Sequence, residues 1–103
     1  MDYVLVIQVP GATIEDYDGL VAIEDDLIAV LGDSAEVDGH DFGSGEGNIF
    51  IVTQDPSSTF ALVRAPLEQA GILANCKVAH RELEGEHFTV LWPESFSGQF
   101  EVK

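Results

Sequence analysis

The chain has 103 residues, of which 46% are hydrophobic, and its formal net charge is −15. This length fits a single domain, residues 1–103, that buries one modest core. The charge excludes direct binding to a nucleic-acid backbone and disfavours anionic membranes, because both need Lys or Arg to meet phosphate.

The N-terminal third predicts a strand followed by a helix. Residues 3–9 are apolar on both faces, which is typical of a central strand. The helix that follows begins at Asp16 or Asp18 and ends before Gly32, which is placed to be the C′ residue. Its apolar stripe consists of Leu20, Ile23, Leu27, Val30 and Leu31.

The middle of the chain predicts a β-hairpin. Residues 35–42 alternate in polarity, which indicates a short, exposed edge strand. Residues 43–47 contain three glycines and form the turn. Residues 48–53 are strongly apolar and form the second strand.

The C-terminal half predicts a second helix and a second hairpin. Asp55 serves as the N-cap and Pro56 as the first helical residue. Pro66 should kink or break this helix, because it removes a backbone donor and clashes with the preceding turn. Strands are expected at 76–82 and 88–92. The apolar stripe of the helix consists of Phe60, Val63, Leu67 and Ala70.

This order of elements, β-α-β-β-α-β-β, resembles the ferredoxin-like βαββαβ plait with an extra C-terminal hairpin strand. We expect an α+β two-layer sandwich, with an antiparallel sheet and both helices on one of its faces. Right-handed crossovers would place the first and third strands side by side in the centre. Residues 94–103 have no clear period and are expected to form a loosely packed tail. The resemblance implies no functional residues, because this fold hosts many activities.

The segment from Asp38 to Asn48 is the most unusual stretch of the chain, because it contains three acids, a His, a Ser and an Asn around four glycines. Its glycines do not have the spacing or the following helix of a phosphate-binding loop, and the calcium-loop pattern is absent. Ser44 and His40 are able to meet across the turn, but no nucleophile elbow accompanies them. A recognition loop is therefore favoured over a catalytic one, and we expect no enzymatic activity.

Two further histidines flank the last predicted turn. His80 and His87, together with Glu82 or Glu86, have the chemistry to bind zinc or iron. Neither helical spacing nor a Cys pair supports such a site, so exposed strand histidines are the favoured interpretation. No metal and no cofactor are expected.

The acids are unevenly distributed. Residues 1–55 contain thirteen Asp and Glu and no Lys or Arg. Such a surface would steer the protein towards a basic partner, although it is equally consistent with solubility alone. The format is similar to that of bacterial immunity or inhibitor proteins, which neutralise basic toxins. The expected partner-binding residues are Glu24, Asp25, Asp26, Asp38, His40, Asp41 and Glu46.

Two other functions remain open. One is a small-ligand- or metal-dependent activity at the His40–Asn48 loop, and the other is self-association through an edge strand as a weak homodimer. The net charge opposes the second at low salt and favours a monomer. No signal peptide or membrane span is visible, and the single cysteine, Cys76, is expected to be a buried, unreactive thiol, so a cytoplasmic location is predicted.

Overall fold

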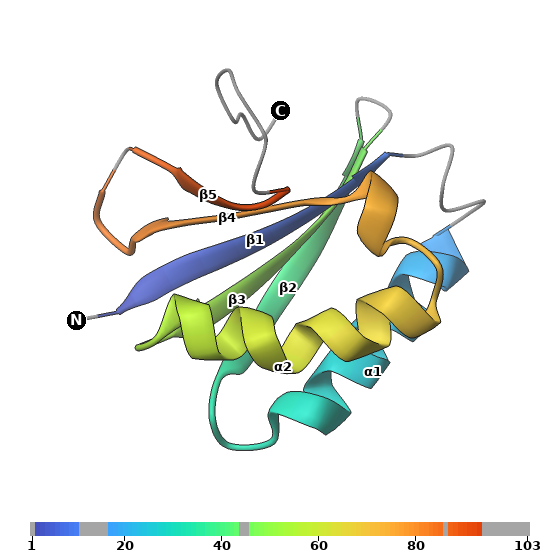
Figure 1. The fold of residues 1–103 in the computed structure, drawn as a ribbon, viewed down its shortest axis with the longest axis horizontal. Coiled ribbons are helices and arrows are strands. Elements are labelled where there is room, and N and C mark those ends of the chain that lie inside the picture. Colours follow the sequence, from blue (N-terminus) through green and yellow to red (C-terminus); the bar gives the residue numbers. More distant parts are fainter. Residues whose placement is uncertain (1, 11–16, 44–45, 86, 94–103) are drawn as a thin grey trace.

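The computed structural model describes residues 2–10, 17–43, 46–85 and 87–93, which form an α+β fold (Figure 1). Strands and helices occur where the sequence predicts them, within a few residues. In chain order they are β1 (Tyr3–Pro10), α1 (Tyr17–Leu31), β2 (Glu36–Gly43), β3 (Glu46–Thr53), α2 (Pro56–Gln69), a short 3₁₀ helix (Leu73–Asn75), β4 (Lys77–Glu82) and β5 (Thr89–Trp92).

The strands of the described chain form one antiparallel sheet in the order β2-β3-β1-β4-β5 (Figure 1). β1 lies between β3 and β4, and its Ile7 is opposite Ile49 on one side and Val78 on the other. The first and third strands are therefore neighbours in the middle of the sheet, as predicted. β2 lies at one edge of the sheet, which confirms the predicted edge strand.

The two faces of the sheet are covered differently. Leu5 and Ile7 point to the face on which α1 and α2 lie, and they belong to the main hydrophobic core (Figure 1). Val4 and Val6 point to the opposite face and form a smaller buried cluster with Ala79, to which none of the described helices contributes. Because β1 buries side chains on both faces, its sequence is a continuous apolar run.

Helix α1 buries part of its predicted stripe. Ile23, Leu27 and Leu31 are buried against the sheet at the expected spacing of four residues. Val30 is 39% exposed, so its assignment to the buried stripe was wrong: a residue three positions after Leu27 falls at the margin of this face. Gly32 has a φ of 54° and donates its N–H to Ile28 O, as expected of a C′ glycine.

Helix α2 has the predicted start and stop. The Oδ1 atom of Asp55 accepts the backbone N–H of Ser58 at 3.1 Å, and Pro56 is the first helical residue. Gly71, with a φ of 76°, follows the last turn, and Ile72 donates its N–H to Leu67 O. The bond from Ser58 to Asp55 and the bond from Ile72 to Leu67 thus satisfy backbone groups that a bare helix end would leave unpaired.

Of the two predicted effects of Pro66, a kink or a break, the break is wrong, since α2 runs on to Gln69. Pro66 stands in the last turn, where a missing donor costs a single intrahelical bond, and Ala70 still donates its N–H to Pro66 O at 3.0 Å. In the predicted stripe Val63 and Leu67 are fully buried, Phe60 is partly buried and Ala70 is exposed.

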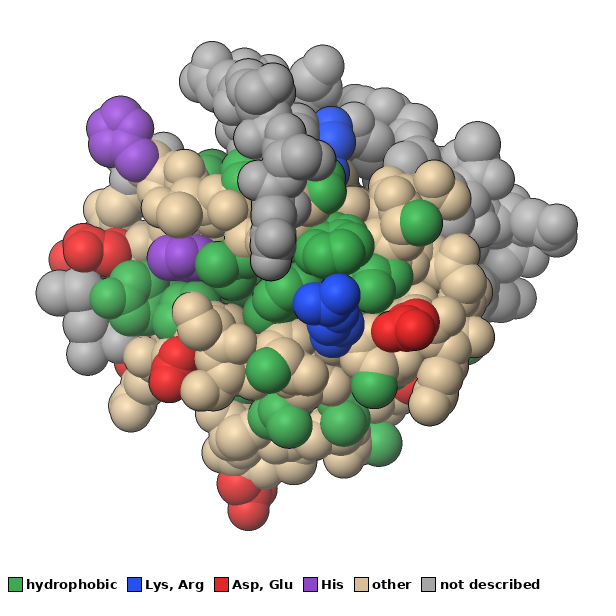
Figure 2. All heavy atoms as spheres, in the orientation of Figure 1, with side chains coloured by type: hydrophobic (Ala, Val, Ile, Leu, Met, Phe, Trp, Pro, Cys, Tyr) green, Lys and Arg blue, Asp and Glu red, His purple; other side chains and the backbone are tan. Residues whose placement is uncertain are grey.

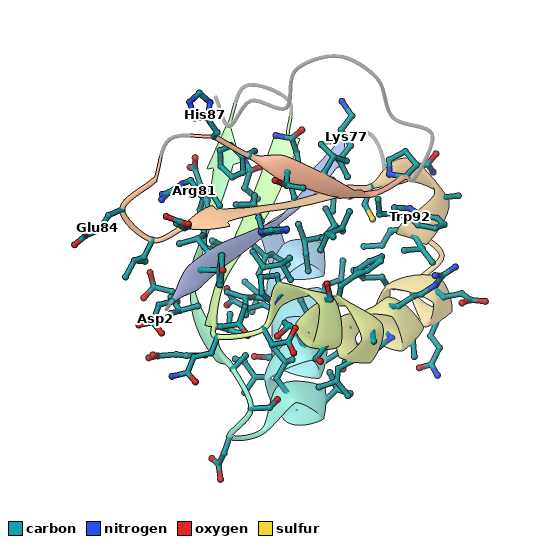
Figure 3. The ribbon with its side chains drawn as sticks, turned by 60° about the vertical axis from the view of Figure 1, so that its left-hand side comes forward. Asp2, Lys77, Arg81, Glu84, His87 and Trp92 are labelled. Atoms are coloured by element: carbon teal, nitrogen blue, oxygen red, sulfur yellow. The ribbon has the colours of Figure 1, made fainter. Side chains whose placement is uncertain are left out.

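Trp92 connects the end of β5 to the helical layer (Figure 3). Its Nε1–H donates to Leu73 O at 2.8 Å, and its ring lies 6.2 Å from that of Phe60, centre to centre. The guanidinium of Arg64 stacks over the indole at 4.7 Å. This aromatic residue is thus part of the fold, as expected for most of the C-terminal aromatics, whereas Phe96 and Phe100 lie outside the described residues.

Candidate partner-binding surface

Two of the predicted binding residues contact each other. The Nδ1 atom of His40, on β2, lies 2.9 Å from the Oε2 atom of Glu24, on α1. Their side chains are only 20% and 14% exposed. This contact ties the edge strand to the helix, so both residues have a structural role and neither side chain is fully accessible to a partner.

The remaining predicted acids lie on the surface. Asp25 and Asp26 are exposed on α1, and Asp38 and Asp41 are exposed on β2. The side chain of Glu46 lies outside the described part of the structure. α1 packs beside β2 and neither element contains a Lys or Arg, but Asp41 pairs with Asn48 and therefore points to the face of the sheet away from the helices. On the face that it views, Figure 2 shows acidic side chains mainly at the margins.

The segment from His40 to Asn48 does not bring its two end residues together. Asn48 is buried and its Oδ1 accepts the Nε2–H of Gln8 at 3.2 Å, on the face of the sheet away from the helices. His40 pairs with Ile49 and points to the helix face. Ser44, the candidate nucleophile, lies outside the described residues.

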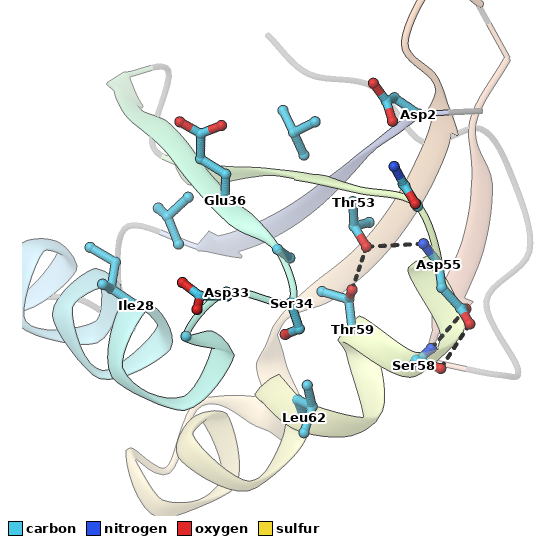
Figure 4. Close-up of a pocket in the computed structure, with 15 residues that line it drawn as sticks. Asp2, Ile28, Asp33, Ser34, Glu36, Thr53, Asp55, Ser58, Thr59 and Leu62 are labelled. Atoms are coloured by element: carbon cyan, nitrogen blue, oxygen red, sulfur yellow. Dashed lines mark hydrogen bonds between the residues drawn. The ribbon is translucent and has the colours of Figure 1, made fainter.

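A concave feature lies where α1 ends and β2 begins. It is a groove of about 880 Å³ between the C-terminal end of α1, the start of β2, the end of β3 and the first turns of α2 (Figure 4). Four acids line it and no Lys or Arg does. They are Asp2, Asp33, Glu36 and Asp55. Ile28 and Leu62 add apolar surface and are 50% and 39% exposed.

Hydrogen bonds fix one wall of this groove. The hydroxyl oxygens of Thr53 and Thr59 lie 2.7 Å apart in buried surroundings, and Thr53 Oγ1 also accepts the Asp55 N–H at 3.0 Å (Figure 4). Asp55 in turn accepts the backbone and hydroxyl donors of Ser58, and these bonds lower the pKa of its carboxyl group. Asp55 therefore stays ionised at neutral pH.

Sequence reasoning missed this groove. Two of its apolar residues, Ile28 and Leu62, are large hydrophobics that fall outside the buried stripes of their helices. That mismatch was the available signal, because a helix with an apolar residue off its buried face either exposes it or contacts something else.

The histidines near the last turn line a common pocket, and Glu86, one of their two candidate carboxylate partners, lies outside the described residues. A smaller pocket of about 360 Å³ is lined by Tyr3, His80 and His87, but the described residues contain no group of three potential ligands. His87 points away from the sheet (Figure 3). His80 packs edge-on against Tyr3, with ring centres 5.7 Å apart, and burial lowers its pKa. Its buried Nδ1 atom has no hydrogen-bond partner.

Cys76 is buried, as predicted, and its Sγ donates to Leu73 O at 3.4 Å. Within the described residues, neither helix is long and apolar enough to cross a bilayer. Comparisons with protein-family models, with curated proteins and with solved structures gave no match to this chain.

Proposed function

We propose that this protein is a non-enzymatic binding module that captures a basic protein partner. The observation that carries the proposal is the placement of exposed carboxylates on α1, β2 and the connection between them, a continuous stretch of chain without Lys or Arg. Asp25 and Asp41 represent its two main elements. Exposed carboxylates concentrated in such a stretch raise the rate and selectivity of association with an oppositely charged surface.

The competing explanation is that the acidic surface only keeps the protein soluble. Solubility depends on net charge, whereas partner capture depends on where the charge lies. Two pairs of exposed acids allow this comparison. Asp25 on α1 and Asp41 on β2 lie in the stretch without Lys or Arg, whereas Glu68 on α2 and Glu84 in the β4–β5 turn lie outside it.

The test compares two double variants of equal net charge. Asp25→Lys with Asp41→Lys should slow capture of a basic partner from host lysate on the order of tenfold or more, because charges at the rim of an interface control the association rate. Glu68→Lys with Glu84→Lys should leave capture nearly unchanged. Bound partner should elute as salt is raised from about 50 mM to about 500 mM, over which the screening length falls severalfold. Equal losses in both variants would refute the proposal.

We further propose that the fold is a ferredoxin-like plait extended by β5. The strand order β2-β3-β1-β4 and the antiparallel pairing of every adjacent pair support this assignment. The format would then be similar to that of small inhibitor or immunity proteins. We also propose a reducing cytoplasmic location, in keeping with the free thiol of Cys76.

A further inference from the structure

We infer that the groove between α1 and α2 is the seat of a basic, amphipathic segment of the protein partner, in which apolar side chains alternate with Lys or Arg. This inference rests on the proposed function and names its docking site. The site lies outside the residues that the sequence indicated, since Asp33, Glu36, Ile28 and Leu62 were not among them.

The shape of the groove suits a polypeptide segment. Pockets that hold small molecules bury most of the ligand surface, whereas much of this lining is exposed to solvent. Ile28 and Leu62 come from different helices, yet both line the groove (Figure 4). They are two of the four large hydrophobic residues that are exposed in the described chain. Exposed apolar side chains within a polar border are typical of the centre of a protein–protein contact.

The charge of the groove selects the partner. Among the described residues, the carboxylates of Asp2, Asp33 and Glu36 have no hydrogen-bond or ion-pair partner, so they are available to Lys or Arg of an incoming chain. The Asp55 carboxylate adds fixed negative charge. An apolar centre with an acidic border complements a segment whose apolar side chain is flanked by cations.

The wall of the groove is already organised in the free protein. The hydrogen bonds of Thr53 with Thr59 and of Asp55 with Ser58 hold the end of β3 against the first turn of α2. A site that is ordered before binding loses little further freedom on association. The groove is thus expected to bind without rearrangement of its backbone.

The test uses a short synthetic peptide in which Leu alternates with Lys, and a control peptide in which Ser replaces Leu. In a methyl NMR titration, the Leu/Lys peptide should shift the methyl signals of Ile28 and Leu62, whereas the Ser/Lys peptide should shift them little. Leu62→Ser should weaken binding of the Leu/Lys peptide about tenfold, because one large apolar contact is lost.

A matched control variant is Val30→Ser, since Val30 lies on α1, is 39% exposed like Leu62, and does not line the groove. It should bind the Leu/Lys peptide as the unmodified protein does, and thermal melts would confirm that both variants fold. Equal affinity of the two variants, or methyl signals of Ile28 and Leu62 that do not move, would overturn the inference. Shifts confined to the surroundings of Asp25 and Asp41 would also overturn it, while leaving the proposed function intact.

Discussion

The hydroxyl pair beside the groove allows a quantitative prediction, because its two members differ in their partners. Thr53 Oγ1 contacts Thr59 Oγ1 and also accepts the Asp55 N–H, whereas Thr59 Oγ1 is bonded to Thr53. Thr53→Val therefore leaves a buried Thr59 hydroxyl unpaired and removes the acceptor of a backbone N–H. Thr59→Val removes one bond and leaves the Asp55 N–H satisfied. Both side chains are almost completely buried, so water does not replace the lost partners.

Net hydrogen-bond values set the magnitudes. A typical bond contributes about 1 kcal/mol and an unsatisfied buried group costs about 1–3 kcal/mol, so Thr53→Val should lower the free energy of unfolding by about 2 kcal/mol and Thr59→Val by about 1 kcal/mol. The double variant should lose about 2 kcal/mol, less than the sum, because replacing both partners removes the unsatisfied hydroxyl. Urea unfolding followed by the fluorescence of Trp92, the single tryptophan, measures all three. Additive losses, or a smaller loss for Thr53→Val than for Thr59→Val, would show that the pair is not coupled as described.

Two further predictions concern the buried titratable groups. Burial lowers the pKa of His80, so the unfolded chain binds a proton more readily, and stability should fall as pH drops through about 6.5. Urea unfolding between about pH 7.5 and about pH 5.5 should show that His80→Phe lacks this part of the pH dependence of stability. A difference in the free energy of unfolding between the variant and the unmodified protein that stays constant with pH would contradict the prediction. Burial raises the pKa of the Cys76 thiol to about 11. A thiol reagent should therefore label the native protein far more slowly than the protein unfolded in urea. Equal labelling rates would contradict the burial of this side chain.

The features that the sequence predicted correctly depend on local chemistry. The start of α2 follows from Asp55 and Pro56, and its end from Gly71, because each residue satisfies or removes backbone groups close to itself. The centre of the sheet follows from the apolar run of β1. The location of the groove does not follow from the sequence in this way. It depends on the rotation of α1 and α2 about their axes and on the angle between them, and no local sequence pattern contains that information.

The contact between Glu24 and His40 is another feature that local sequence patterns do not predict. Simple alternation along β2 would place Val37 and Gly39 on the same face of the sheet. The bulge between them adds one residue, so Val37 and His40 share the helix face instead, opposite Ile51 and Ile49. A shift of one residue in register thus decides that His40 meets α1, and residue types alone do not reveal the bulge.

Both arginines of the chain are held by contacts within its C-terminal half. Arg64 stacks over Trp92, and Nη1 of Arg81 donates to three backbone carbonyls in the β4–β5 turn. Both guanidinium groups thus stabilise the C-terminal half. The exposed acids of α1 and β2 have no Lys or Arg on their own elements. Their mutual repulsion opposes folding, and a bound cationic segment would relieve it. Binding of a basic partner should therefore raise the stability of the N-terminal half as well as occupy its surface.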